Sequence, residues 1–155
     1  AGLILTDTGV KVIEFNARFG DPETQVVLPR LADPLSELLL AAASGHLEDH
    51  DRPSFSDAAT VTVVIASEGY PASPATGRTL SGLDRAEALD GVHLAHAATA
   101  LHDGEFLATG GRVLSVVGVG SSLADARDRV YRGVDAIGLE GGQHRRDIAA
   151  RAADA

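Results

Sequence analysis

The chain has 155 residues, of which 45% are hydrophobic and 23% are charged, a balance typical of one ordinary globular domain or two small ones. Its net charge of -9 excludes a nucleic-acid backbone as the main partner, because phosphate-backbone binding needs an excess of Lys and Arg. The absence of cysteine excludes disulfides and thiolate metal sites, and no apolar run approaches the roughly 20 residues that span a bilayer, so we expect a cytoplasmic protein without a membrane partner.

The first predicted element is a β-hairpin. Residues 3–6 and 10–15 are apolar and partly β-branched, and they flank a turn at Asp7-Thr8-Gly9 in which Gly9 can adopt a positive φ. Because the chain goes directly from Ala1 into this strand-like run, we expect it to be a piece of a longer protein.

Two helices are predicted next. The Asp-Pro pair at 21–22 indicates that Asp21 is an N-cap followed by the first helical residue, and Pro29 is expected to divide the helix that follows. The pair at 33–34 repeats this start signal before a helix that ends at Gly45. Its apolar residues recur at i, i+3, i+4 and i+7, namely Leu35, Leu38, Leu39 and Ala42.

The polar segment at 46–57 indicates a domain boundary, which divides the chain into residues 1–50 and 51–155. Beyond it the sequence predicts a second hairpin with its turn at 102–104, and apolar strands at 59–66, 92–101, 105–109 and 112–119.

The last predicted element is a helix that begins at Ser122, where Asp125 three residues later resembles a capping box, and ends at Gly138. One face carries Leu123, Ala126, Val130, Val134 and Ile137. The fold class is therefore α+β: the end of one α/β unit, followed by a small antiparallel sheet with a packed helix.

Glu14 and Asn16 are the candidate metal ligands. Residues i and i+2 of a strand point to the same face, so a carboxylate and an amide oxygen would lie side by side at the end of the hairpin. Such oxygens suit Mg²⁺, which usually keeps phosphates and waters as its other ligands. The alternative is a solvated Glu14 beside a turn-forming Asn16.

The stretch at 12–25, V-I-E-F-N-A-R-F-G-D-P-E-T-Q, resembles the phosphoribosylamine–glycine ligase family, ATP-grasp enzymes of purine biosynthesis. Three further motifs follow in the family's order: A-S-E-G-Y-P at 66–71, T-G-G-R-V-L at 109–114 and E-G-G-Q-H-R-R-D-I at 140–148. The resemblance implies the last strands of an ATP-grasp fold in residues 1–50 and the family's small C-terminal domain in residues 51–155.

The resemblance implies an ATP-dependent ligase with ATP as co-substrate, which joins glycine to 5-phosphoribosylamine through an acyl phosphate. Glu14 and Asn16 match the family's Mg²⁺ or Mn²⁺ ligands. Arg18 is the candidate catalytic residue, because a guanidinium can hold the glycine carboxylate or the acyl phosphate through two hydrogen bonds. Its alternative is an internal partner for Asp21 or Glu23.

By analogy with related ATP-grasp enzymes, Gly111 and Arg112 are the candidates for binding the ribose 5-phosphate. Glycine at this point lets a backbone come close to a ligand. The alternative is a hairpin that needs flexible residues there. A second hypothesis is that the isolated chain is a non-catalytic packing or small-molecule-binding module. It has no recognisable purine-binding segment and no glycine-rich loop over phosphates, and in the family these lie upstream, in a missing N-terminal part of the same polypeptide.

Overall fold

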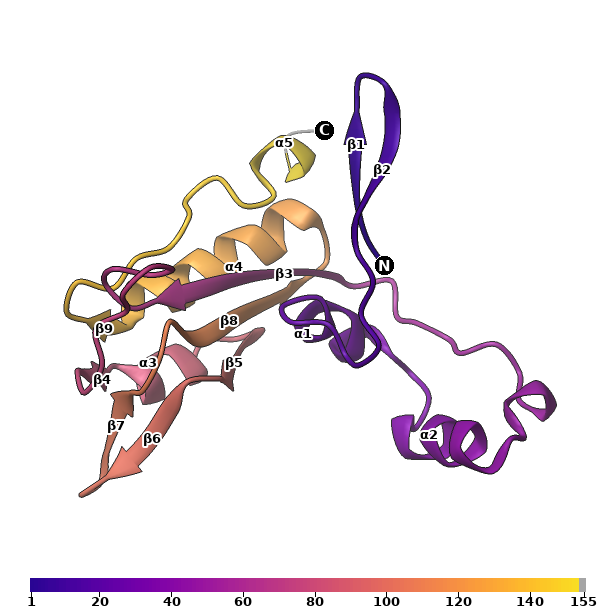
Figure 1. The fold of residues 1–155 in the computed structure, drawn as a ribbon, viewed down its shortest axis with the longest axis horizontal. Helices are drawn as coiled ribbons and strands as arrows, with labels where there is room; N and C mark the ends of the chain where they lie inside the picture. Colours follow the sequence, from indigo (N-terminus) through magenta and orange to yellow (C-terminus); the bar gives the residue numbers. More distant parts are fainter. Residues whose placement is uncertain (154–155) are drawn as a thin grey trace.

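The computed structural model describes residues 1–153 and has an α+β fold (Figure 1). The first third of the chain contains a hairpin and short helical elements: β1 (Gly2–Thr6), β2 (Gly9–Glu14), α1 (Thr24–Val27), the 3-10 turn η1 (Leu28–Arg30), α2 (Leu35–Ser44) and the 3-10 turn η2 (Leu47–Asp49). The hairpin is confirmed: β1 and β2 are antiparallel, Thr6 pairs with Gly9, and Gly9 has a φ of 103°.

A three-stranded antiparallel sheet in the order β3-β8-β5 forms the centre of the molecule. Its strands are β3 (Ala59–Ala66), β8 (Arg112–Gly120) and β5 (Val92–His96), which confirms the predicted strands at 59–66 and 112–119. The long helix α4 (Leu123–Ala136) lies along this sheet (Figure 1). A Cβ at Gly118 would overlap the carbonyl oxygen of Ala126, so this glycine lets α4 lie close to β8.

The hydrophobic core lies between α4 and the three-stranded sheet. Three of the five residues predicted for the apolar face of α4 are buried, namely Ala126, Val130 and Val134, and they pack in one cluster with Val61, Val63, Ile65, Leu114 and Val116. Leu123 at the start of the helix is 38% exposed. Ser122 caps this helix as predicted, because its Oγ accepts a hydrogen bond from the backbone N–H of Asp125 at 3.1 Å.

A second, four-stranded sheet in the order β6-β7-β4-β9 adjoins the first. Its strands are β6 (Thr99–His102), β7 (Glu105–Ala108), β4 (Thr79–Ser81) and β9 (Gly138–Leu139). The elements β4 and β9 and the short helices α3 (Leu83–Glu87) and α5 (Ala150–Ala153) were not predicted. The helix predicted to end at Gly138 ends at Ala136, because Gly138 already pairs with Ser81 in β9.

The single strand predicted at 92–101 is wrong, although the hairpin turn after it is confirmed. The chain bends at Ala97 and Ala98, whose N–H groups donate to the carbonyl oxygens of Val113 and Arg112. The part before the bend, β5, pairs with β8, whereas the part after it, β6, pairs with β7 in the other sheet.

The N-cap predicted at Asp21 is also wrong. Helix α1 begins at Thr24 without a side-chain cap, and the carboxylate of Asp21 instead contacts Gln25 and Arg112. Pro29 ends α1 as expected, because the chain continues as the 3-10 turn η1. Helix α2 does follow the second Asp-Pro pair, and its C-cap is Gly45, which has a φ of 78°. The N-cap signal is wrong here too, because α2 begins at Leu35 without a side-chain cap and the carboxylate of Asp33 accepts from Ser54 instead.

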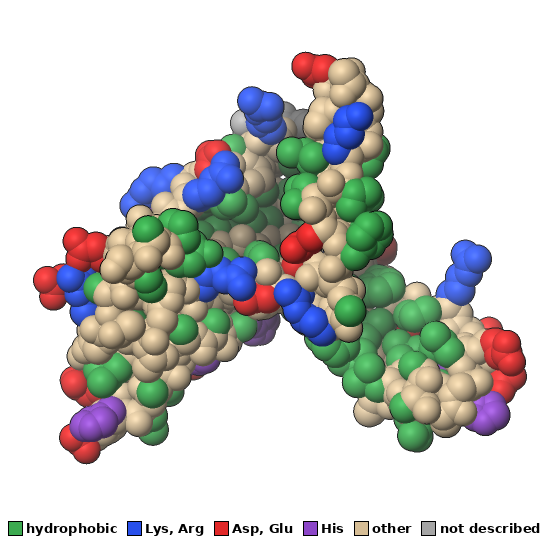
Figure 2. Space-filling model, in the orientation of Figure 1, with side chains coloured by type: hydrophobic (Ala, Val, Ile, Leu, Met, Phe, Trp, Pro, Cys, Tyr) green, Lys and Arg blue, Asp and Glu red, His purple; other side chains and the backbone are tan. Residues whose placement is uncertain are grey.

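The hairpin and α2 extend away from the two sheets (Figure 1) and carry large exposed hydrophobic side chains, which Figure 2 shows in green. Leu5 and Phe15 are each 81% exposed, Ile13 is 66% exposed, and Leu40 of α2 is 70% exposed. Exposed apolar surface of this extent usually marks a site where another part of a protein packs.

Within residues 1–153, the helices are all too short or too polar to cross a lipid bilayer.

Candidate functional site

The polar side chains at the end of the hairpin form a connected series. Strand β2 ends at Glu14, and two residues later the side-chain amide of Asn16 donates a hydrogen bond to Oε1 of Glu14 at 3.2 Å. The guanidinium of Arg18 in turn donates to Oδ1 of Asn16 and, at 3.0 Å, to the carbonyl oxygen of Phe19. The structure therefore brings together the three residues predicted for the metal and catalytic roles.

A cavity of about 290 Å³ lies beside this series, between the end of the hairpin and α1. Asn16 and Arg18 line it, whereas Glu14 is exposed and lies outside the lining. The remaining lining residues are Ala1, Phe19, Gly20, Glu23, Thr24, Val27 and Leu28. Asn16 and Arg18 thus reach an open cavity from the segment that directly follows β2.

Glu14 and Asn16 both carry oxygen atoms, the type of ligand that a small, hard cation prefers. Glu14 has a second carboxylate oxygen that makes no contact with Asn16, and Oδ1 of Asn16 keeps one lone pair after it accepts from Arg18. Within residues 1–153 there is no group of three or more His, Cys, Asp or Glu side chains that would hold a metal. In this arrangement the amide nitrogen of Asn16 faces Glu14, whereas its oxygen faces Arg18, so the two predicted ligand oxygens point to different partners. The Mg²⁺ site at Glu14 and Asn16 stays a prediction.

Arg112 lies at the start of β8, where its backbone is held in the sheet. Its side chain reaches back to Asp21: Nη1 donates to the carbonyl oxygen of Asp21 at 3.1 Å, and Nη2 lies 3.2 Å from Oδ2 of its carboxylate. Arg112 is thereby brought next to the segment that follows Arg18, although no contact joins the two arginines.

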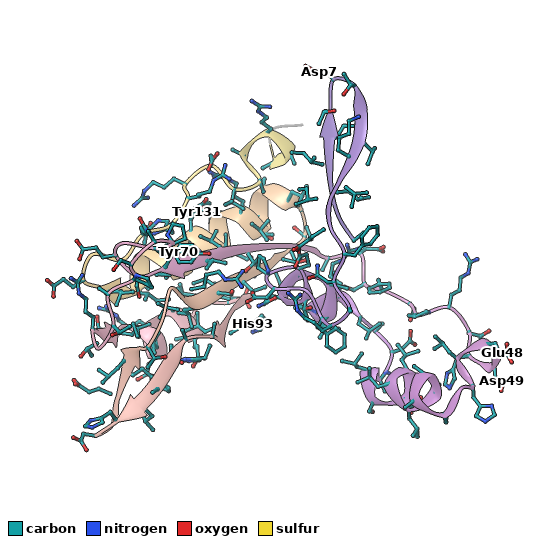
Figure 3. The ribbon with its side chains drawn as sticks, in the orientation of Figure 1. Asp7, Glu48, Asp49, Tyr70, His93 and Tyr131 are labelled. Carbon is teal, nitrogen blue, oxygen red and sulfur yellow. The ribbon has the colours of Figure 1, made fainter. Side chains whose placement is uncertain are left out.

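Gly111 provides room for a protein side chain. A Cβ at this position would overlap the ring of Tyr70, which lies near the end of β3 (Figure 3). Its carbonyl oxygen accepts a hydrogen bond from the N–H of Ser67 at 2.8 Å, so the backbone is held from both sides. The predicted role of Gly111 in substrate binding is therefore restricted to faces of the backbone that Tyr70 leaves free.

A second cavity, of about 350 Å³, lies on the other side of Arg112. It is lined by Val64, Ala66, Tyr70, Arg112, Gln143, His144 and Arg145. Nε2 of His144 is buried without a hydrogen-bond partner, and burial, with a smaller contribution from the charge of Arg146, lowers the pKa of this imidazole. Sequence reasoning gave His144 no role, although the motif at 140–148 contains it.

The comparisons with known proteins agree on one family. Residues 60–151 match the model of the phosphoribosylglycinamide synthetase C domain. The chain is 61% identical over 153 residues to the phosphoribosylamine–glycine ligase of Leifsonia xyli and 56% identical over 157 residues to that of Streptomyces coelicolor. These matches cover 97% and 100% of this chain but only 37% and 38% of the two relatives.

Two further relatives extend the comparison. A trifunctional purine biosynthetic protein of Gallus gallus is 45% identical over 98% of this chain, which corresponds to 15% of that protein. The crystal structure of a phosphoribosylamine–glycine ligase from Thermotoga maritima superposes with a TM-score of 0.74 at 30% identity, over 94% of this chain and 35% of that one. The chain thus spans less than two-fifths of the length of these relatives.

Proposed function

The chain belongs to the phosphoribosylglycinamide synthetase family, and we propose that it is the C-terminal part of a ligase that joins glycine to 5-phosphoribosylamine with ATP. The single observation that carries this proposal is the family match over residues 60–151, preceded in the same chain by Glu14, Asn16 and Arg18 in one contact series. This family membership confirms the resemblance found in the sequence.

The proposed reaction has two steps. The glycine carboxylate attacks the γ-phosphorus of ATP, so that ADP leaves and an acyl phosphate forms. The amine of 5-phosphoribosylamine then attacks the acyl carbon, inorganic phosphate leaves, and an amide remains. Neither step needs a nucleophile from the protein, so the work of the side chains is to position the reactants and to stabilise charge.

Glu14 and Asn16 are proposed to hold the divalent ion, Mg²⁺ or Mn²⁺, at the end of the hairpin. A bound ion would offset the negative charge of the phosphate oxygens during transfer. This assignment is supported by the oxygen donors that the two side chains present, and by the small number of protein ligands that Mg²⁺ requires when it also binds phosphates.

Arg18 is proposed to hold the glycine carboxylate or the acyl phosphate. It lines the cavity of about 290 Å³, and only one of its guanidinium nitrogens, Nη1, is used in the contacts to Asn16 and Phe19. The remaining N–H groups are available for the two-pronged hydrogen bonds that carboxylates and phosphates accept.

Gly111 and Arg112 are proposed to contact the ribose 5-phosphate. The side chain of Arg112 is 42% exposed and lines the second cavity, so it has N–H groups to offer beyond those that contact Asp21. This role stays a prediction, as does the cytoplasmic location.

The nucleotide-binding part is proposed to come from the upstream portion of the same polypeptide. The exposed apolar side chains of the hairpin, such as Leu5 and Phe15, would pack there as strands of the ATP-grasp fold. The alternative, a non-catalytic packing or small-molecule-binding module, is favoured for the 155-residue chain alone by the same exposed surface.

The test is the substitution Glu14→Ala in the complete ligase that contains this chain, with product formation measured over a range of Mg²⁺ concentrations. The expected result is a rate reduced by about a hundredfold or more at limiting Mg²⁺. The matched control is Glu48→Ala, because Glu48 is an exposed glutamate on η2, far from the hairpin (Figure 3). Unchanged turnover in Glu14→Ala at limiting Mg²⁺ would refute the metal role.

A further inference from the structure

Asp21 links the polar segment after the hairpin to the central sheet. Its carbonyl oxygen accepts a hydrogen bond from Nη1 of Arg112 at 3.1 Å, its Oδ2 forms an ion pair with Nη2 of Arg112 at 3.2 Å, and its Oδ1 accepts from Nε2 of Gln25 at 3.0 Å. Asp21 and Arg112 are 91 residues apart in the sequence. One residue therefore connects α1, the segment that carries Arg18, and the first residue of β8.

The arginine side of this contact is rigid. Arg112 opens β8, its own carbonyl oxygen accepts the N–H of Ala98, and the next two residues, Val113 and Leu114, are fully buried. Buried core strands undergo local unfolding least often in native proteins, so the backbone of Arg112 is expected to stay in place.

The aspartate side of the contact is otherwise weakly held. Arg18 and Phe19 are exposed, and helix α1 has only four residues and no side-chain cap. Farther along, the hydroxyl of Thr60 donates to the carbonyl oxygen of Val26 at 2.7 Å, and α1 packs against β3 and β8. Without Arg112, the segment from Asn16 to Asp21 would be connected to the central sheet indirectly, through α1 and η1, which pack against β3.

We propose that Asp21 is a positioning residue, which acts through Arg112 to fix Asn16 and Arg18 relative to the central sheet. This inference rests on the proposed function, because it concerns the reaction in which those two residues take part. The side chains of Asp21 and Arg112 are 37% and 42% exposed, and partly exposed ion pairs contribute little to global stability. The effect of the contact is therefore on local geometry, and a misplacement of about 1 Å at a reacting group costs roughly a hundredfold in rate.

The conservative variant Asp21→Asn separates charge from geometry. The amide oxygen of Asn at position 21 can still accept from Arg112. Oε1 of Gln25 is buried without a partner, and if the Gln25 amide turns over, this oxygen can accept from the new amide nitrogen. Asp21→Asn is therefore expected to keep most of the activity that Asp21→Ala loses.

The experiment is a double-mutant cycle in the complete ligase with Asp21→Ala, Arg112→Ala and both together. Each single variant is expected to lower kcat by about ten- to a hundredfold while the melting temperature changes little. The double variant should have a kcat no lower than that of the worse single one, because both substitutions remove the same contact. A kcat loss that adds fully across the cycle would overturn the proposal.

A second readout does not depend on activity. The N–H groups of Thr24, Val26 and Val27 donate to the carbonyl oxygens of Gly20 and Glu23, so their hydrogen exchange reports how well this region is held. Exchange should become about tenfold faster in both single variants and no faster still in the double variant. Unchanged exchange in Asp21→Ala would also overturn the proposal.

The matched control is Arg132→Ala, which removes a guanidinium from the exposed pair with Asp128 on α4. This control should change neither kcat nor exchange of α1. If the wild-type ligase makes no product, the proposed function fails while the exchange measurement still tests the contact. If Arg112→Ala raises KM for 5-phosphoribosylamine where Asp21→Ala does not, Arg112 also binds substrate, and a shared loss of kcat would still support the positioning role.

Discussion

The side-chain amide of Asn16 donates to Oε1 of Glu14 at 3.2 Å, which places the two predicted metal ligands in direct contact at the end of the hairpin. The same amide group accepts from Arg18 through its oxygen. Asn16 therefore lies between the carboxylate of Glu14 and the guanidinium of Arg18. Without it these two groups would pair, because opposite charges at this spacing attract.

Replacement of Asn16 by Ala should remove both its oxygen ligand and this separation. In the complete ligase we expect kcat/KM to fall by about a hundredfold, because Arg18 loses the acceptor that orients it. Steady-state kinetics with glycine and 5-phosphoribosylamine measure the loss. Asn16→Asp, which keeps an oxygen at the same place, is the control and should retain more activity; equal losses in the two variants would contradict the interpretation.

The 155-residue chain alone should neither hydrolyse ATP nor make product. Residues 1–153 contain the proposed metal ligands Glu14 and Asn16 and the cavity beside Arg18, and the nucleotide-binding part is proposed to lie upstream. Phosphate release and product formation by the purified chain provide the measurement, with the complete ligase as the positive control. Ligase turnover by the isolated chain would show that this division of roles is wrong.

Removal of the cap of α4 should weaken the domain core. Ser122→Ala deletes the oxygen that accepts the N–H of Asp125 at 3.1 Å, and loss of such a cap costs about 1 kcal/mol of unfolding free energy. Urea unfolding followed by circular dichroism measures the change. Ser73→Ala removes an exposed serine whose side chain caps no helix and should leave the unfolding midpoint unchanged.

His144 should make stability depend on pH. Burial lowers its pKa below the ordinary value of 6.5, so the folded state favours the neutral imidazole. Its stabilising contribution is complete above pH 6.5 and is lost as the pH falls from there through the lower folded-state pKa, because the unfolded chain takes up a proton first. The unfolding free energy of the wild type should therefore decrease between pH 7.5 and 5.5.

The variant His144→Phe should lose this part of the pH dependence and should be at least as stable as the wild type at neutral pH, since it removes a buried nitrogen without a partner. Thermal unfolding at several pH values measures both effects. The control His102→Asn changes an exposed histidine at the turn of a hairpin. An identical pH profile for His144→Phe and the wild type would refute the assignment.

The elements that the sequence predicted correctly are those whose information is local. The first hairpin followed from an apolar run, a glycine turn and a second apolar run, and the cap at Ser122 followed from its spacing to Asp125. The proximity of Glu14 and Asn16 was predicted from the period of two along a strand, although Asn16 lies just beyond the end of β2. The contact between Arg18 and Asn16 was not predicted.

The missed features depend on partners far away in the sequence. Asp21 has the residue type of an N-cap, but Arg112, 91 residues later, takes its carboxylate. The strand predicted at 92–101 divides at Ala97 because its first half pairs with β8 in one sheet and its second half pairs with β7 in the other. Strands β4 and β9 have three and two residues, too few for a periodic pattern, and they form by pairing: β9 with β4, and β4 also with β7.

The central position of β8 has a consequence for synthesis on the ribosome. In the three-stranded sheet, β3 and β5 pair only with β8, so neither has its partner until residues 112–120 have left the exit tunnel. Helix α4, which completes the core, emerges later still. Nascent chains of this protein should therefore expose Val61, Val63 and Ile65 while residues 67–120 are synthesised, and a chaperone that binds apolar strands can act during that interval.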